Sequence, residues 1–187
     1  VPTTVRYARA QRAATAARRV QDRPWTSRLM PAGRYYVGDP CYVITERLGY
    51  NWQRACRDTG VFSLDTESDD GRQPIWAGQF AVTSDAGERA RIFASGTAHG
   101  DGCYADQEGR EYGVDAGLIG CVPMDALPED AERIITEERL GHIVDFTEDF
   151  RCETIEPHEA QGAIKIGHVE ILTDRDYDCE DEGDNRW

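Results

Sequence analysis

Short stretches of alternating apolar and polar residues, separated by glycine, aspartate and proline, cover most of the chain after residue 33. Their apolar members are mainly β-branched and aromatic residues, which favour strands, while the separators favour turns. The pattern predicts about seven short strands, in the ranges 34–37, 41–44, 74–85, 89–100, 111–124, 141–155 and 163–174. The long crossovers that a parallel sheet requires are missing from this pattern, so a mostly antiparallel sheet is expected.

Two stretches of the same region have helical character instead. Residues 51–58 (NWQRACRD) predict one short helix, and residues 130–139 (DAERIITEER) predict another. The second has an apolar stripe, with Pro128 before it and Gly141 after it, as expected at the two ends of a helix. The predicted fold class is therefore α+β: a β-rich, mostly antiparallel curled sheet or barrel-like core with one or two short helices.

Charge divides the chain into three parts. Residues 1–34 carry eight Arg and one Asp, a net charge of +7, and the remaining residues carry −21, which together give the formal net charge of −14. We therefore expect a basic, Ala- and Arg-rich arm over residues 1–33, one β-rich domain over residues 34–173 and an acidic tail over residues 174–187. The segment after Met30 is typical of the opening of a compact protein, so a natural start near Met30 is the alternative to a functional arm.

These charges bear on the partners. The acidic domain would repel nucleic acid and suits a basic protein surface. The arm over residues 1–29 suits nucleic acid, an acidic partner or a role as an organelle transit peptide. No apolar run is long enough to span a membrane and no secretory signal is visible, so no membrane association is expected. The six cysteines include no CxxC spacing, and we expect mostly reduced thiols in a cytoplasmic or virion-associated protein.

One five-residue pattern occurs twice: GDPCY at residues 38–42 and GDGCY at residues 100–104. Glycine permits a positive φ, and an aspartate side chain can hydrogen-bond to the backbone that follows it, so each pattern predicts a turn. The Cys-Tyr pair would then begin the next strand, with its two side chains on opposite faces of the sheet. On this interpretation, which we prefer, the repeat reflects turn chemistry alone.

Two chemical interpretations require that the two turns converge on one candidate site, formed by Asp39, Cys41, His99, Asp101, Cys103 and Asp115. Carboxylate, imidazole and thiolate groups are a ligand set that zinc accepts. Alternatively, Cys41 or Cys103 is a nucleophile, His99 is its base, and Asp101 or Asp115 orients that base. No complete motif surrounds these residues. The sequence therefore predicts no catalytic residue and no cofactor, with a divalent metal as the alternative.

Three segments carry a resemblance: RYYVGDPCYVI (34–44), GDGCY (100–104) and EYGVDAGLIGCVP (111–123). Together they resemble a group of small uncharacterised proteins of bacteria and their phages. Those proteins open with a YxxGDPCYV-like segment, have a Gly-Asp-Gly turn in mid-chain and continue with a GVDxGxI-like strand. The resemblance covers residues 34–173 and implies a cytoplasmic or phage-linked setting, without an established activity or a catalytic residue. The basic extension over residues 1–29 departs from the group's pattern.

Three functions are consistent with these features. The first, which we favour, is a small soluble acidic accessory protein that acts as a non-enzymatic binding module and is phage-linked. The second is a Cys- or metal-dependent hydrolase with its site at the two GD-x-CY turns, which requires Asp39 and Asp101 to lie close together. The third is a virion or assembly component that uses the basic arm.

Overall fold

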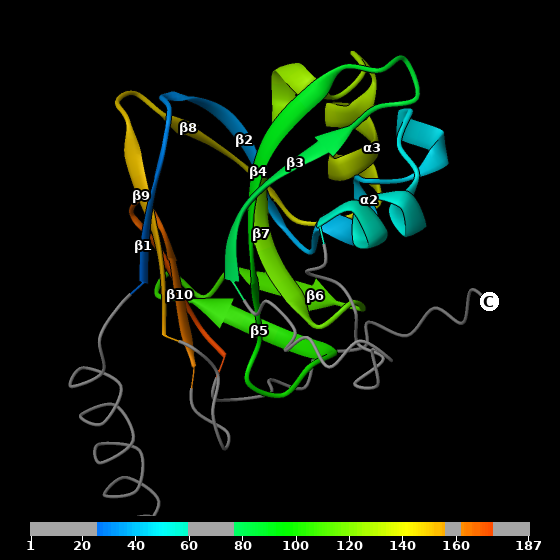
Figure 1. The fold of residues 1–187 in the computed structure, drawn as a ribbon. Coiled ribbons are helices and arrows are strands. Elements are labelled where there is room, and N and C mark those ends of the chain that lie inside the picture. The colour runs from blue at the N-terminus through cyan, green and yellow to red at the C-terminus, as the bar shows by residue number, and fades with distance from the viewer. Residues whose placement is uncertain (1–25, 60–76, 156–161, 174–187) are drawn as a thin grey trace, which may run out of the picture.

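The computed structural model describes residues 26–59, 77–155 and 162–173 of the 187-residue chain. Within these ranges eleven strands form two antiparallel sheets (Figure 1). The six-stranded sheet contains, in spatial order, β1 (Thr26–Met30), β9 (Phe150–Ile155), β10 (Ala163–Ile166), β11 (Val169–Leu172), β5 (Gly102–Asp106) and β6 (Glu111–Val114). The five-stranded sheet contains β3 (Ala77–Thr83), β4 (Arg89–Gly96), β7 (Leu118–Pro123), β2 (Gly33–Gly38) and β8 (His142–Phe146).

The helices lie on the face of the five-stranded sheet that points away from the six-stranded sheet (Figure 1). They are the α-helices α2 (Trp52–Thr59) and α3 (Ala131–Glu137) and the 3-10 helices η1 (Pro40–Tyr42), η2 (Glu46–Leu48) and η3 (Met124–Ala126). The described part of the chain contains no helix with the length and hydropathy needed to cross a membrane. The fold therefore has three layers: sheet, sheet and helices.

Two apolar clusters hold these layers together. In β2, Tyr35 and Val37 belong to the cluster between the two sheets, while Tyr36 belongs to the cluster between the five-stranded sheet and the helices. All three side chains are at most 2% exposed. Because strand residues alternate between faces, this continuous run of buried residues follows from a sheet that is covered on both sides. Burying an apolar side chain of this size contributes about 2 kcal/mol.

Hydroxyl and thiol groups also meet across the two sheets. Ser95 Oγ of β4 lies 2.7 Å from Thr154 Oγ1 of β9, and both residues are fully buried. The Sγ atoms of Cys121 (β7) and Cys152 (β9) lie 3.8 Å apart and belong to free thiols. A buried hydroxyl without a partner costs free energy, so the Ser95–Thr154 contact favours one alignment of the two sheets over others.

The β-rich, mostly antiparallel α+β class predicted from the sequence is confirmed, and the barrel-like alternative is not, since the two sheets are not closed into a barrel. The helices predicted at 51–58 and 130–139 are confirmed as α2 and α3. Strands outnumber the expected seven because three predicted stretches contain a turn and because β1 and β5 lie outside the seven ranges. Residues 111–124 and 141–155 each cross from one sheet to the other, and residues 163–174 contain the β10–β11 hairpin.

Residues 26–33, which the sequence analysis placed in the basic arm, form β1 and the start of β2. β1 runs antiparallel to β9, from the Thr26–Thr154 pair to the Met30–Phe150 pair. Met30 is fully buried between the two sheets. Residues 1–25 of the proposed arm and residues 174–187 of the proposed tail lie outside the described residues.

Deletion of residues 1–29 should destabilise the domain, because it removes four of the five β1 residues that pair with β9. Each lost backbone hydrogen bond contributes about 0.5–1.5 kcal/mol, so the free energy of unfolding should fall by about 2 kcal/mol or more. The matched control is deletion of residues 1–25, which keeps all of β1. Urea unfolding of both variants measures the difference, and equal stabilities would contradict a structural role for β1.

Candidate functional site

The two GD-x-CY segments have different local structures. In the second, Cys103 and Tyr104 lie at the start of β5, as the sequence predicts. In the first, Cys41 and Tyr42 belong to the 3-10 helix η1, so the strand predicted at 41–44 is wrong. Pro40 fixes its own φ near the helical value, and the Asp39 carboxylate caps the helix by accepting a hydrogen bond from Cys41 N at 2.9 Å.

Asp39 is a fully buried carboxylate that joins two distant parts of the chain. Its Oδ2 accepts hydrogen bonds from Asp115 N at 2.8 Å and from Ala116 N at 2.7 Å, in the turn between β6 and β7. Burial raises the pKa of Asp39 above its ordinary value, although the three amide N–H groups act in the opposite direction. Its contacts identify Asp39 as an acceptor for backbone amides that would otherwise be unpaired.

The second GD-x-CY segment reaches the same turn from the other side. Thr97 N donates to the Gly117 carbonyl at 2.9 Å. A Cβ built on Gly117 would lie 3.4 Å from Gly100 Cα and 3.9 Å from Asp101 Oδ1. Asp39 and Asp101 therefore both border the turn of residues 115–117. The structure thus brings Asp39, Cys41, Asp101 and Asp115 together at one place.

The other two candidate residues have separate surroundings. His99 is exposed in the loop between β4 and β5. Cys103 is buried in β5 and is disulfide-bonded, so it carries no free thiol for nucleophilic attack. In the described ranges, no three His, Cys, Asp or Glu side chains are arranged as ligands of a metal ion.

The Cys41 thiol lies in an environment that opposes ionisation. Burial raises the pKa of Cys41 well above its ordinary value, and the carboxylates of Asp39, Asp115 and Asp101 raise it further. A nucleophilic cysteine instead requires a lowered pKa, supplied by a neighbouring cation, an imidazolium or a helix N-terminus. At neutral pH the Cys41 side chain is therefore a neutral thiol that packs beside acidic groups.

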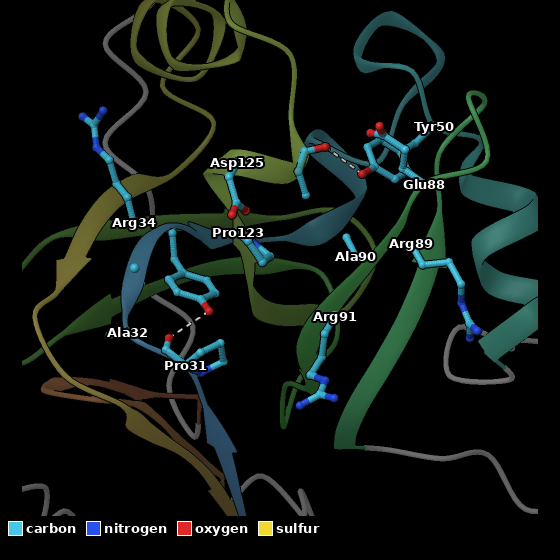
Figure 2. Close-up of a pocket in the computed structure, with 13 residues that line it drawn as sticks. Pro31, Ala32, Arg34, Tyr50, Glu88, Arg89, Ala90, Arg91, Pro123 and Asp125 are labelled. Atoms are coloured by element: carbon cyan, nitrogen blue, oxygen red, sulfur yellow. Dashed lines mark hydrogen bonds between the residues drawn. The ribbon is translucent and has the colours of Figure 1, made fainter.

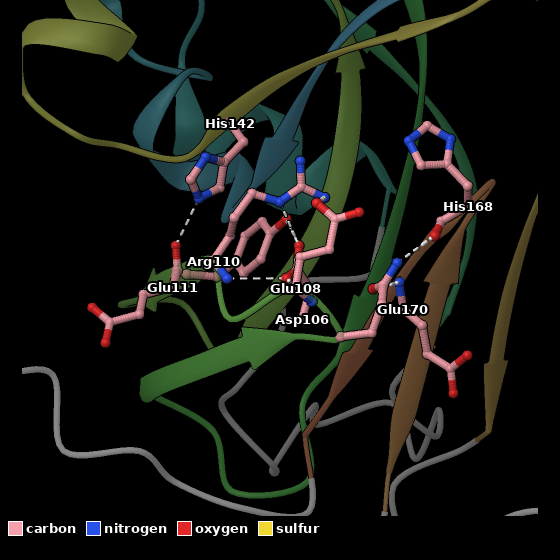
Figure 3. Close-up of polar contacts among 9 residues, drawn as sticks. Asp106, Glu108, Arg110, Glu111, His142, His168 and Glu170 are labelled. Atoms are coloured by element: carbon pink, nitrogen blue, oxygen red, sulfur yellow. Dashed lines mark hydrogen bonds and ion pairs between the residues drawn. The ribbon is translucent and has the colours of Figure 1, made fainter.

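A second buried carboxylate organises the β5–β6 turn (Figure 3). Asp106 Oδ1 accepts from Glu108 N at 2.9 Å and from Arg110 N at 3.0 Å, while Oδ2 accepts from Arg110 Nε at 2.7 Å and from the Tyr112 hydroxyl at 3.0 Å. Burial acts to raise the pKa of Asp106, but these hydrogen bonds outweigh it and the pKa lies below its ordinary value. All of its contacts serve the turn, so Asp106 is another structural carboxylate.

Two histidines near this turn are engaged by their neighbours (Figure 3). His142 Nε2 donates to the Glu111 carbonyl at 2.9 Å, and the imidazole ring meets the Tyr112 ring edge-on at 4.8 Å. The His168 carbonyl accepts from Gln107 Nε2 at 2.7 Å. Both contacts join neighbouring elements, the first through the His142 side chain and the second through the His168 backbone.

A cavity of about 510 Å³ lies elsewhere, at one end of the five-stranded sheet (Figure 2). One wall comes from the segment leading into β2 and from β2 itself, the other from the start of β4, and the residues after β7 lie between them. Its charged and aromatic lining consists of Arg34, Tyr35, Tyr50, Glu88, Arg89, Arg91 and Asp125. A cavity of this volume is in the range of small-ligand sites.

The arginines of the cavity differ in their partners. The Arg34 guanidinium donates two hydrogen bonds, of 2.6 and 2.7 Å, to the carboxylate of Glu132 on α3 in a bidentate contact. Arg89 and Arg91 are exposed and form no ion pair or side-chain hydrogen bond with any described residue. The sequence analysis missed this cavity. The only signal for it was the alternation of Arg89 and Arg91 in a predicted strand, which places both side chains on one face.

Comparison of the chain with protein-family models, with curated proteins and with solved structures finds no match. Similarity therefore assigns neither a family nor a function, and the function has to be argued from the cavity and from the Asp39–Cys41 cluster.

Alkylation should show that Cys41 is not an activated thiol. Because its pKa is raised, we expect iodoacetamide at pH 7.5 to modify Cys41 at least tenfold more slowly in the folded protein than in the urea-unfolded chain. Peptide mass spectrometry separates Cys41 from Cys56, whose pKa burial raises to about 11. Modification of Cys41 that is faster in the folded protein would instead indicate a nucleophile and favour the hydrolase.

Asp106→Asn should destabilise the protein by about 2 kcal/mol at pH 7, because it replaces an ionised acceptor of Arg110 and Tyr112. A carboxylate with a lowered pKa in the folded state stabilises above its unfolded pKa of about 3.9 and loses this contribution as pH falls through the folded value. The difference between wild type and variant should therefore shrink below pH 4. Urea unfolding from pH 3 to pH 7 measures it, with Glu108→Gln, whose parent side chain is 60% exposed, as the control. A difference independent of pH would contradict this assignment.

Proposed function

We propose that this protein is a non-enzymatic binding module whose ligand places negatively charged groups in the cavity between β2 and β4. The observation that carries this proposal is that Arg89 and Arg91 line the cavity without a carboxylate partner among the described residues. A guanidinium group binds carboxylate and phosphate groups through paired, charge-assisted hydrogen bonds. The cavity thus offers two such groups, two residues apart on one strand.

The charge balance of the chain makes these two arginines informative. The sequence has 35 acidic and 21 basic residues, so carboxylates are in excess. Arginines at other positions pair with acidic side chains: Arg34, Arg47, Arg54, Arg57, Arg110 and Arg133. Two guanidinium groups on the wall of a cavity, with no acidic partner in the described part of the chain, are therefore offered to a ligand from outside.

The hydrolase alternative has less support. Its four clustered residues, Asp39, Cys41, Asp101 and Asp115, include no cation or imidazole that would lower the pKa of the thiol. Asp39 is already occupied by three backbone amides. A general base needs a free lone pair directed at its substrate.

The sequence also predicts a protein partner and a cellular location, and neither prediction depends on the cavity. A basic protein surface stays a predicted partner of the acidic body, and a cytoplasmic, phage-linked or virion setting stays a prediction from the sequence. The assembly function depends on the basic arm, of which residues 1–25 lie outside the described residues. We place the anionic ligand first, because it alone accounts for the cavity and for two arginines whose side chains pair with no residue in the described ranges.

Matched small ligands test this function. In NMR titrations, glutarate should shift the amides of residues 32–35, 88–91 and 124–126, whereas pentane-1,5-diamine, which has the same length and the opposite charge, should not. The double variant Arg89→Gln/Arg91→Gln should weaken glutarate binding at least tenfold, because a charge-assisted hydrogen bond contributes about 1.5–3 kcal/mol. Arg57→Gln is the control, since Arg57 lies on α2 with a side chain that is 75% exposed. Binding of the diamine alone would favour the basic partner, and glutarate shifts confined to residues 115–117 would favour the Asp39–Cys41 cluster.

A further inference from the structure

The cavity lies where β7 leaves the side of β4. β4 pairs with β7 only from Phe93–Cys121 to Gly96–Leu118. β2 keeps its pairing with β7 two residues longer, as far as Tyr35–Pro123. The end of β7 therefore stays with β2 and separates from β4. Residues 89–92 of β4 pair with β3 alone among the described strands.

The chain after β7 leaves the plane of the sheet and does not fill this wedge. Met124 and Ala126 of η3 pack toward the cluster on the helical side. The Ala126 carbonyl is held there by the Tyr50 hydroxyl at 2.7 Å. Proline ends the ladder because it has no N–H to donate. The space left beside β4 is the cavity, and Pro123 and Asp125 line it between β2 and β4 (Figure 2).

An open strand edge carries backbone groups that need partners. In an antiparallel ladder, alternate residues direct their N–H and C=O groups to opposite sides. Some of residues 89–92 therefore direct these groups away from β3 and into the cavity. Such an edge binds an extended peptide as an additional strand, with main-chain hydrogen bonds providing affinity and alternate side chains providing specificity.

The side chains along this edge define which peptide fits. Arg89 and Arg91 are two residues apart and share the face that carries Phe93 into the core between the sheets. Residues of an added strand that lie opposite them would have their side chains on that same face, within reach of the guanidinium groups. Acidic side chains at every second position of the peptide therefore complement the two arginines.

We infer that the cavity binds an extended acidic peptide of a partner protein, which pairs antiparallel with residues 89–92 of β4 and places alternate carboxylates on Arg89 and Arg91. This inference rests on the proposed function and specifies its ligand. The peptide must form hydrogen bonds between its own backbone and the backbone of β4, which binding of a simple anion does not require.

The test uses a blocked heptapeptide of alternating valine and glutamate with the full chain. We expect saturable binding by calorimetry and slower hydrogen exchange at alternate amides of residues 89–92. A valine–lysine peptide of the same length should not bind. Arg89→Gln/Arg91→Gln should weaken binding of the acidic peptide at least tenfold, and Arg57→Gln should leave it unchanged.

Backbone methylation separates strand pairing from simple charge attraction. Two further acidic peptides carry N-methyl groups on all valines or on all glutamates, which removes the N–H donors of one edge at a time. At least one of them should bind tenfold more weakly than the parent. If both bind as the parent does, or if β4 gains no protection, the strand inference is overturned.

Three further outcomes bear on this inference and on the proposed function. If glutarate binds at the cavity and no peptide does, the strand inference fails and the anion-binding function stands. If neither binds, both fail. If residues 89–92 are already protected in the free protein and no peptide binds, the chain itself covers this edge and an external peptide is ruled out.

Discussion

Coverage of both faces of the five-stranded sheet is the constraint on which the rest of the structure depends. The last four residues of β2 and nearly all of β7, its central strands, are buried, so one face needs the six-stranded sheet and the other needs the helices. The chain meets this requirement by crossing between the sheets after β1, β4, β6 and β8. Each crossing exposes backbone amides inside the fold, and these must find acceptors. The buried carboxylate of Asp39 supplies the acceptor at the crossing after β6.

The same need for acceptors explains the contacts of Asp39, a candidate site residue of the sequence, and of Asp106, which the sequence analysis did not single out. Asp39 and Asp106 are both buried, both bind backbone amides, and both determine the course of a turn. Their pKa values shift in opposite directions, because Asp39 has only neutral donors against its burial, whereas Asp106 also has the Arg110 guanidinium. A carboxylate next to a cysteine in the sequence is therefore weak evidence for a nucleophilic site. The neighbours in space decide which role it has.

The fold class and both α-helices were predictable because they depend on local patterns: alternation of apolar residues, Pro128 and Gly141. The sequence wrongly predicted a strand at residues 41–44. Pro40 and the Asp39 cap favour a 3-10 helix there, whereas GDGCY has a glycine in place of Pro40 and continues as a strand. The convergence of the two segments on residues 115–117 depends on long-range pairing, which no local pattern encodes. The sequence identified the four residues of that cluster as candidates. Only the structure shows which groups surround them and therefore that the Cys41 thiol is not activated.

The cavity was beyond sequence reasoning for a related reason. The β7–β2 ladder continues two residues beyond the end of the β7–β4 ladder, as far as Pro123. Such an offset between two ladders is a property of three strands at once. A solvent-exposed edge would normally be protected by lysine, proline or a bulge against unspecific pairing. Arg89 and Arg91 serve that purpose against most peptides, since they repel cationic segments and gain nothing from neutral ones. The same two charges would then select for acidic strands, so protection of the edge and specificity for a ligand arise from one pair of residues.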